Sequence, residues 1–224
     1  MYLHKITIDS EALRRDRKIY QDVYLLHKKI WELVSRNESQ KRDFLYRVEY
    51  AAYQNIKHIY LLAPNQISSQ KNIKIAVSPR YQPQLETGEF LFFKLRANPI
   101  IKRKENGKAK EYSLVMDAKH QFKKNGQNYQ EQFSLDELIH DVGMKWLIRK
   151  GEQHGFSVKQ FEVKTNNDCE YSIKLPGKKV FTLRTLDFEG KLKIVDADRF
   201  KKSLFNGIGS AKAFGCGMMM VKRI

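Results

Sequence analysis

The stretch that decides the fold is GIGSAKAFGCGMMMV, residues 207–221. Four of the chain's twelve glycines fall within its first eleven residues, together with one lysine, Lys212. Glycine adopts positive φ and lets backbone amides approach an anion, so a glycine loop with a lysine is typical of a phosphate site. A flexible turn before a final strand explains the same residues equally well.

The spacing of this loop excludes the common nucleotide-binding motifs. A Walker loop needs Gly-Lys followed by Ser or Thr at the start of a helix, whereas Ala213 follows Lys212 here. A dinucleotide fingerprint needs a third glycine three residues after the second, at the position that Lys212 occupies.

Upstream of the loop, the second half has the β-α-β-β-α-β order of a ferredoxin-like fold, interrupted by a polar insert at about 100–131. Its predicted strands and helices alternate along the chain. We expect strands at 90–99, 156–164, 180–195 and 213–222, and helices at 135–152 and 196–205.

The first half begins in the same way but shows no convincing second helix. We expect strands at 2–8, 44–50, 57–63 and 73–78, with one amphipathic helix at 19–35. The predicted fold is therefore α+β, with two tandem ferredoxin-like (RRM-like) domains. The first, 1–88, carries the helix, and the second, 89–224, carries the basic insert and the glycine-rich loop. The aromatic signature of RRM domains is absent from the sequence.

Composition points to a polyanionic partner. The chain has 42 Lys and Arg against 25 Asp and Glu, a net charge of +17. Such a basic chain usually binds nucleic acid, or less often an acidic membrane surface. Two cysteines, Cys169 and Cys216, form no framework and indicate reduced thiols. We find no signal peptide or membrane-spanning stretch, and we expect a cytoplasmic protein.

The predicted helix at 19–35 carries the candidate catalytic residue. On a helical wheel, Tyr20, Tyr24, His27 and Trp31 form a stripe beside the buried face. At this partly solvent-exposed position an imidazole can be held by packing and still exchange its proton with solvent. An ordinary aromatic core edge with a hydrogen-bonded histidine is the alternative. The other histidines show no metal spacing, and no acidic cluster could hold two metals, so we expect no metal.

The insert is rich in lysine and contains the turn Asn106-Gly107. A basic hairpin or long loop of this kind can contact the phosphates along the major groove of an RNA stem. The alternative is a solvated surface loop that binds nothing. The candidate contacts are Lys102, Arg103, Lys104, Lys108 and Lys110.

Several pieces, in order, resemble the CasE (Cse) family of CRISPR-associated endoribonucleases, the crRNA-processing subunit of Cascade. The Tyr-x-x-His-x-x-x-Trp helix and the Arg-Ala-Asn-Pro sequence are the most specific. The pieces are DVYLLHKKIWELV (22–34), RDFLYRVE (42–49), FKLRANPI (93–100), LDFEGKLKI (186–194) and GIGSAKAFGCGMM (207–219).

This resemblance implies a metal-independent cut at the base of a CRISPR repeat hairpin, with the product retained. The family's catalytic histidine matches His27, its tyrosine partner matches Tyr24, and its glycine-rich loop with a lysine matches 207–217 and Lys212. Its partners would be repeat hairpin RNA and other Cascade subunits, without a membrane or a small-molecule cofactor. The remaining RNA-binding candidates are Lys28, Arg96, Gly207, Gly209, Ser210, Gly215 and Gly217.

The residues also indicate a mechanism. A ribose 2′-hydroxyl attacks the adjacent phosphate, and the products are a 2′,3′-cyclic phosphate and a 5′-hydroxyl. His27 is the general base or general acid, Tyr24 orients the nucleophile or shares the proton transfer, and Lys212 with the loop amides neutralises the phosphorane. Two other functions remain open: a non-catalytic RNA-binding subunit with this fold, and a cationic protein that binds membranes or nucleic acid non-specifically.

Overall fold

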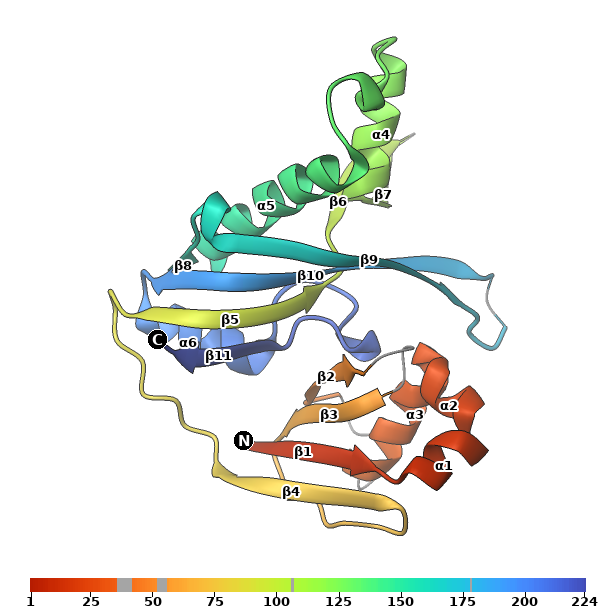
Figure 1. The fold of residues 1–224 in the computed structure, drawn as a ribbon, viewed down its shortest axis with the longest axis vertical. Coiled ribbons are helices and arrows are strands. Elements are labelled where there is room, and N and C mark those ends of the chain that lie inside the picture. The colour runs from red at the N-terminus through yellow and green to blue at the C-terminus, as the bar shows by residue number, and fades with distance from the viewer. Residues whose placement is uncertain (36–41, 52–55, 106, 178) are drawn as a thin grey trace.

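The structure, a computed structural model, describes residues 1–35, 42–51, 56–105, 107–177 and 179–224. The described residues form one large antiparallel sheet in each half of the chain, with the second above the first in Figure 1, and a separate two-stranded hairpin. The first sheet has the order β2-β3-β1-β4, which is the ferredoxin-like order. Its strands are β1 (Tyr2–Ile8), β2 (Leu45–Tyr50), β3 (Ile56–Ala63) and β4 (Ile73–Arg80).

The second sheet repeats this order as β11-β5-β10, with β8 and β9 pairing in turn with the free edge of β10. Helix α5 (Leu135–His154) and helix α6 (Ala197–Asn206) contribute to its buried core. The α+β class and the tandem ferredoxin-like arrangement are confirmed. The strands are β5 (Phe90–Ala97), β8 (Phe156–Ser157), β9 (Val163–Ile173), β10 (Phe181–Ile194) and β11 (Met219–Arg223).

The helix predicted at 19–35 is divided in two. Asp22 ends α2 (Arg17–Gln21) and begins α3 (Val23–Val34), where its carboxylate accepts from the amides of Tyr24 and Leu25. A further short helix, α1 (Ser10–Arg15), precedes them. On α3, the buried residues are Leu26, Ile30 and Val34, at helical spacing.

A loop replaces the second helix of the first half. Because β3 and β4 are both antiparallel to β1, the chain must return along the whole sheet between them. Residues 64–72 can span about 30 Å when extended, which is enough for a strand of eight residues. Buried His4 holds this loop: its Nδ1 lies 3.3 Å from the carbonyl oxygen of Leu61, and its Nε2 accepts from the amide of Ile67 at 3.2 Å.

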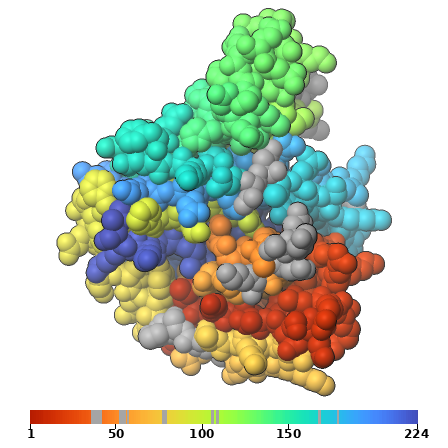
Figure 2. Space-filling view, in the orientation of Figure 1, coloured from red at the N-terminus to blue at the C-terminus, as the bar shows by residue number. Residues whose placement is uncertain are grey.

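The insert forms a hairpin and a helix that stand away from the body (Figures 1 and 2). The hairpin pairs β6 (Ile100–Glu105) with β7 (Lys108–Ser113), and α4 (Leu114–Lys124) follows directly. The basic hairpin was predicted, but α4 was not. The 3-10 helix η2 (Tyr129–Glu131) then leads to α5, which begins with a capping box between Ser134 and Glu137.

Two strand boundaries in the second half were wrong. The strand predicted at 156–164 is only two residues long in β8, and the long strand is β9 instead. The last strand begins at Met219 rather than at 213, because the 3-10 helix η4 (Lys212–Phe214) occupies the loop. Strands β4 and β5 belong to different sheets. A division into folding units at 88/89 stays a prediction.

The two halves meet through a small apolar cluster and a buried ion-pair network. Leu45, Leu62 and Met218 form the apolar cluster. Beside it, Arg96 makes two hydrogen bonds to Asp187, at 2.9 and 2.7 Å, and these side chains are nearly buried. Arg96 also donates to the backbone carbonyl of Val48 in β2 at 3.2 Å, so its guanidinium joins the two sheets.

Candidate functional site

His27 lies where α3 meets the second half of the chain. Its half-buried ring is surrounded by aromatic rings, with centroids 6.0 Å from Trp31, 6.3 Å from Phe44 and 6.3 Å from Phe214. Trp31 follows one turn later on the same helix, Phe44 precedes β2, and Phe214 ends η4 in the glycine-rich stretch. The fold therefore brings the predicted histidine and the predicted loop together.

Burial and a neighbouring cation favour the neutral form of this imidazole. Desolvation, and after it the positive charge of Arg42, lower the pKa of His27 from its ordinary value of 6.5. Nδ1 of His27 and Nη1 of Arg42 are buried and have no hydrogen-bond partner among the described residues. Such atoms cost about 1–3 kcal/mol each when unpaired, and they mark a place that a ligand can complete.

The glycine-rich loop docks on the first half. Its four glycines all adopt positive φ. A Cβ on Gly207 would come within 2.8 Å of Leu45 Cδ2, and one on Gly215 within 3.1 Å of Tyr46 Cε2. The hydroxyl of Tyr46 donates to the carbonyl of Ala213 at 2.9 Å. Side chains at these glycines would therefore push the loop away from β2 and from the histidine site.

Backbone hydrogen bonds fix the shape of the loop and tie it to β5. The amide of Ile208 donates to the carbonyl of Gly217 at 2.9 Å, and the amide of Gly217 donates to the carbonyl of Arg96 at 2.7 Å. Gly209 packs close to Trp146, since a Cβ there would lie 3.2 Å from Cζ2. For these residues the structure favours the turn interpretation.

A basic pocket of about 620 Å³ opens beside the loop, and Lys212 lies on its wall with Arg149, Lys150 and His154 of α5. Burial, followed by the charges of Arg42 and Lys150, lowers the pKa of Lys212. Mutually repelling cations of this kind are stabilised by an anion. Since Arg42 acts on both His27 and Lys212, the histidine site and the basic pocket are electrostatically connected.

The same pocket contains other predicted residues. Ser210, Gly207, Gly209 and Lys102 line it. Its wall also carries Glu111, which pairs with Lys102 across the hairpin at 3.1 Å. The hydroxyl of Ser210 donates to Oδ1 of Asn98 at 2.9 Å, so this serine also braces the loop.

The remaining candidates on α3 lie near His27 in sequence. Tyr24 is half-buried in the first turn, three residues before His27, a spacing that puts two side chains on the same side of a helix. Lys28 is exposed beside them. The structure therefore keeps Tyr24 as a candidate partner of the imidazole.

The hairpin candidates divide into two groups. Lys102, Lys104 and Lys110 are exposed. Arg103 instead makes hydrogen bonds of 2.6 and 2.7 Å to Asp117 of α4, which braces the hairpin against the helix. The side chain of Lys108 lies outside the described part of the chain.

Arg96 occupies the seam between the halves. Its guanidinium is committed to Asp187 and to the carbonyl of Val48, and it lies 5.3 Å from the ring centroid of Tyr50. Arg96 therefore serves the fold, and we do not propose it as an RNA contact.

Sequence reasoning missed Arg42, Arg149 and Lys150. Their charges matter through neighbours that are distant in sequence, which no local pattern shows. The adjacent basic pair Arg149 and Lys150 in α5 is only a weak sequence signal. His154 accepts or donates a hydrogen bond with Ser203 at 2.8 Å, and burial, followed by Lys150 and Lys212, lowers its pKa.

Within the described residues, no group of three or more His, Cys, Asp or Glu side chains could hold a metal ion. None of the helices described here is long and apolar enough to cross a membrane.

Comparisons with known proteins identify the family of the chain. A family model described as CRISPR associated protein matches residues 1–223. The Cascade subunit CasE of Escherichia coli K12 is 29% identical over 219 residues, 98% of both chains. The CRISPR-associated endoribonuclease Cse3 of Thermus thermophilus is 26% identical over 237 residues, 99% of both chains.

Solved structures show the same fold. The crystal structure of Cas6e from Escherichia coli K-12 matches with a TM-score of 0.69 at 25% identity and covers 100% of both chains. Cse3 bound to a 19-nucleotide RNA matches with a TM-score of 0.70 at 23% identity, over 99% of this chain and 98% of the other. The resemblance seen in the sequence is confirmed. The chain belongs to the CRISPR associated protein family, in which its relatives are of the CasE type.

Proposed function

We propose that this protein is an endoribonuclease that cleaves the hairpin of CRISPR repeat RNA and retains the product. The observation that carries the proposal is the meeting of His27, Arg42 and the Lys212 loop at the seam between the two sheets. The net charge of +17 supports a polyanionic substrate. The names of its relatives, a Cascade subunit and an endoribonuclease, support the same class of reaction.

His27 acts as the general base in this proposal. Its lowered pKa keeps the ring neutral near pH 7, so the imidazole can take the proton of a ribose 2′-hydroxyl. The 2′-oxygen then bonds to the adjacent phosphorus while the bond from phosphorus to the 5′-oxygen breaks. The departing 5′-oxygen takes up a proton from water, and the products are a 2′,3′-cyclic phosphate and a 5′-hydroxyl. Tyr24 orients the nucleophile or shares the proton transfer.

Arg42 and Lys212 stabilise the phosphorane. Both cations are partly buried, where a charge interacts more strongly with an oxyanion than it does in water. Arg42 extends the set of residues predicted from the sequence.

We propose that the cut needs no metal, because Arg42 and Lys212 place two positive charges at this site, and these charges repel a divalent ion. We also propose that the protein assembles with other Cascade subunits, as the name of its relative CasE states for that protein.

The test is cleavage of a repeat hairpin by the purified protein in excess EDTA, with end-group analysis of both fragments. The proposal expects unchanged single-turnover cleavage and an upstream fragment that ends in a cyclic phosphate. Cleavage that EDTA abolishes and Mg²⁺ restores would overturn metal independence, and a linear 3′-hydroxyl end would overturn attack by the 2′-hydroxyl.

The alternative is a non-catalytic RNA-binding subunit with the same fold. It predicts tight hairpin binding with no cleavage at any pH. Nδ1 of His27 has no hydrogen-bond partner among the described residues, which favours the enzyme, because a purely structural histidine in a fold is normally hydrogen-bonded, as His4 is.

A further inference from the structure

The second sheet has one face buried in the core that includes α5 and α6, and a second face that carries exposed aromatic rings. On β5, Leu91 and Phe93 point into the core, whereas the alternate residues Phe90 and Phe92 are 49% and 44% exposed. Two neighbouring rings on the open face of a central strand provide surfaces on which unpaired bases can stack.

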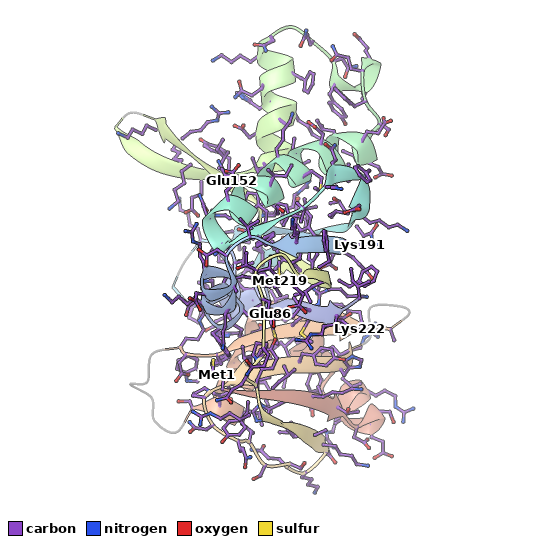
Figure 3. All side chains as sticks on the ribbon, turned by 90° about the vertical axis from the view of Figure 1, so that its left-hand side faces the viewer. Met1, Glu86, Glu152, Lys191, Met219 and Lys222 are labelled. Atoms are coloured by element: carbon purple, nitrogen blue, oxygen red, sulfur yellow. The ribbon has the colours of Figure 1, made fainter. Side chains whose placement is uncertain are left out.

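Lysines from the flanking strands surround both rings. Lys193 and Lys191 of β10 pair with Phe90 and Phe92 in the register, and each ammonium lies 5.7 Å from the centroid of its ring. Lys222 of β11 pairs with Phe92 from the other side. Figure 3 shows Lys191 and Lys222 on the same side of the molecule.

The charge of this face is strongly positive. The next paired positions place Lys94, Lys164 and Glu189 on the same face of the sheet. Lys94 and Glu189 form an exposed ion pair at 3.1 Å. A protein partner with an apolar surface would have to desolvate these lysines, whereas a single strand of RNA offers a phosphate for the charges and a base for the rings.

We propose that the face formed by Phe90, Phe92, Lys191, Lys193 and Lys222 binds single-stranded RNA. This inference rests on the proposed function for its substrate: the unpaired RNA segment next to the repeat hairpin. Bases stack on the two rings, which are about 6.7 Å apart along the strand, and the lysines contact phosphates.

This face is separate from the proposed cleavage site. The basic pocket beside the glycine loop is lined by α5, which packs against the opposite side of the same sheet. At the far end of β5, Arg96 closes the open face against the first half. A strand on the two phenylalanines is therefore bound without occupying the site at His27.

The test measures affinity for three RNAs: the hairpin, the hairpin with an unpaired tail of about ten uridines, and the uridine tail alone. The variant is Phe90→Ala with Phe92→Ala. The matched control is Phe161→Ala, because Phe161 is 83% exposed and has the ammonium of Lys159 at the same 5.7 Å from its centroid. Each variant is first checked for a wild-type melting curve.

We expect the tail to increase wild-type affinity and the double variant to lose that increase, by roughly five- to 100-fold per ring. The affinity for the bare hairpin and that of the control stay unchanged. Lys191→Gln with Lys193→Gln lowers the salt dependence of tail binding by about 0.7 per lost contact.

A wild-type protein that gains nothing from the tail overturns the inference, as does a double variant that keeps the gain. The second result would leave a protein partner as the occupant of this face. Failure of the proposed function looks different: the hairpin would not be cut, while the uridine tail alone would still bind through Phe90 and Phe92.

Discussion

At the scale of single residues, the local environment of each histidine decides its role. His4 and His27 are both desolvated, and both have a lowered pKa. His4 is fully buried with a partner for each ring nitrogen, whereas His27 keeps a buried nitrogen without one among the described residues. The first arrangement serves the fold, and the second leaves a nitrogen for a ligand.

The pH profile of cleavage tests the pair of His27 and Arg42. A general base with a lowered pKa works until the pH falls below that pKa, so the rate should be flat near pH 7 and fall on the acid side. Arg42→Gln removes a positive charge that lowers the pKa of His27, and the acid limb should therefore move to higher pH. A profile that keeps the same acid limb in this variant would contradict the coupling.

Stability against pH tests His4. Its folded-state pKa is lowered, so the unfolded state binds more protons between that lowered pKa and about pH 6.5. The free energy of unfolding should therefore fall as the pH is lowered through 6.5. His4→Gln keeps an acceptor for the amide of Ile67 without titrating, and it should flatten this dependence. An NMR titration that places the pKa of His4 above 6.5 in the wild type would contradict the argument.

At the scale of elements, the sequence predicted the helices and strands that local hydrophobic periodicity determines. Strand β1 was predicted at its observed bounds, and the helix predicted at 135–152 is α5, Leu135–His154. The missing helix of the first half was also noticed correctly. These features depend on neighbours within a few residues, so local patterns report them.

Other elements depend on contacts that are distant in sequence. The long strand β9 is polar (VKTNNDCEYSI) and exists because β10 pairs with it over most of its length. The break between α2 and α3 depends on one aspartate cap, Asp22. Arg42 entered the candidate site in the same way, because only the folded chain brings it to His27 and Lys212.

The glycine loop is an element whose packing can be measured. Gly215→Ala puts a Cβ at φ +79° and 3.1 Å from the ring of Tyr46. We expect it to destabilise the protein by more than the ~1–2 kcal/mol that this backbone conformation costs alone. Gly126→Ala is the matched control, since Gly126 has φ +70° with nothing within 4 Å. Equal losses of unfolding free energy would mean that the loop is not packed as described.

Replacing Lys212 should affect RNA binding or cleavage rather than stability, unlike replacing the loop glycines. Lys212→Ala removes one partly exposed ammonium, which donates to the carbonyl of Asn206 at 2.8 Å. We expect a nearly wild-type melting temperature with weaker hairpin binding or slower cleavage. A folded variant with wild-type affinity and rate would remove Lys212 from the site.

The hairpin is tested through the salt dependence of binding. Replacing Lys102, Lys104 and Lys110 with Ala should lower the slope of log affinity against log salt by roughly 0.7–0.9 per lost phosphate contact. Arg103 is left in place because it braces α4. A control with the same loss of charge replaces Lys5, Lys71 and Lys74, which are exposed on the first half. Equal slopes in the two variants would mean that the hairpin is a solvated loop.

At the scale of the whole molecule, the candidate site belongs to neither half alone. His27 and Arg42 come from the first half, and Lys212 and Phe214 come from the second. The bond from Arg96 to the carbonyl of Val48 and the bond from Tyr46 to Ala213 hold these parts in one geometry. In the proposed mechanism, tandem repetition of one fold thus supplies a base from one copy and an anion-binding loop from the other.

The most direct test of the central claim is single-turnover cleavage of the repeat hairpin by His27→Ala, with hairpin affinity measured on the same preparation. His120→Ala is the control, because His120 is an exposed histidine on α4. Loss of a general base predicts a rate about 10²–10⁴-fold lower, with nearly unchanged affinity because phosphate contacts dominate binding. A folded His27→Ala protein that cleaves at the wild-type rate would contradict the account.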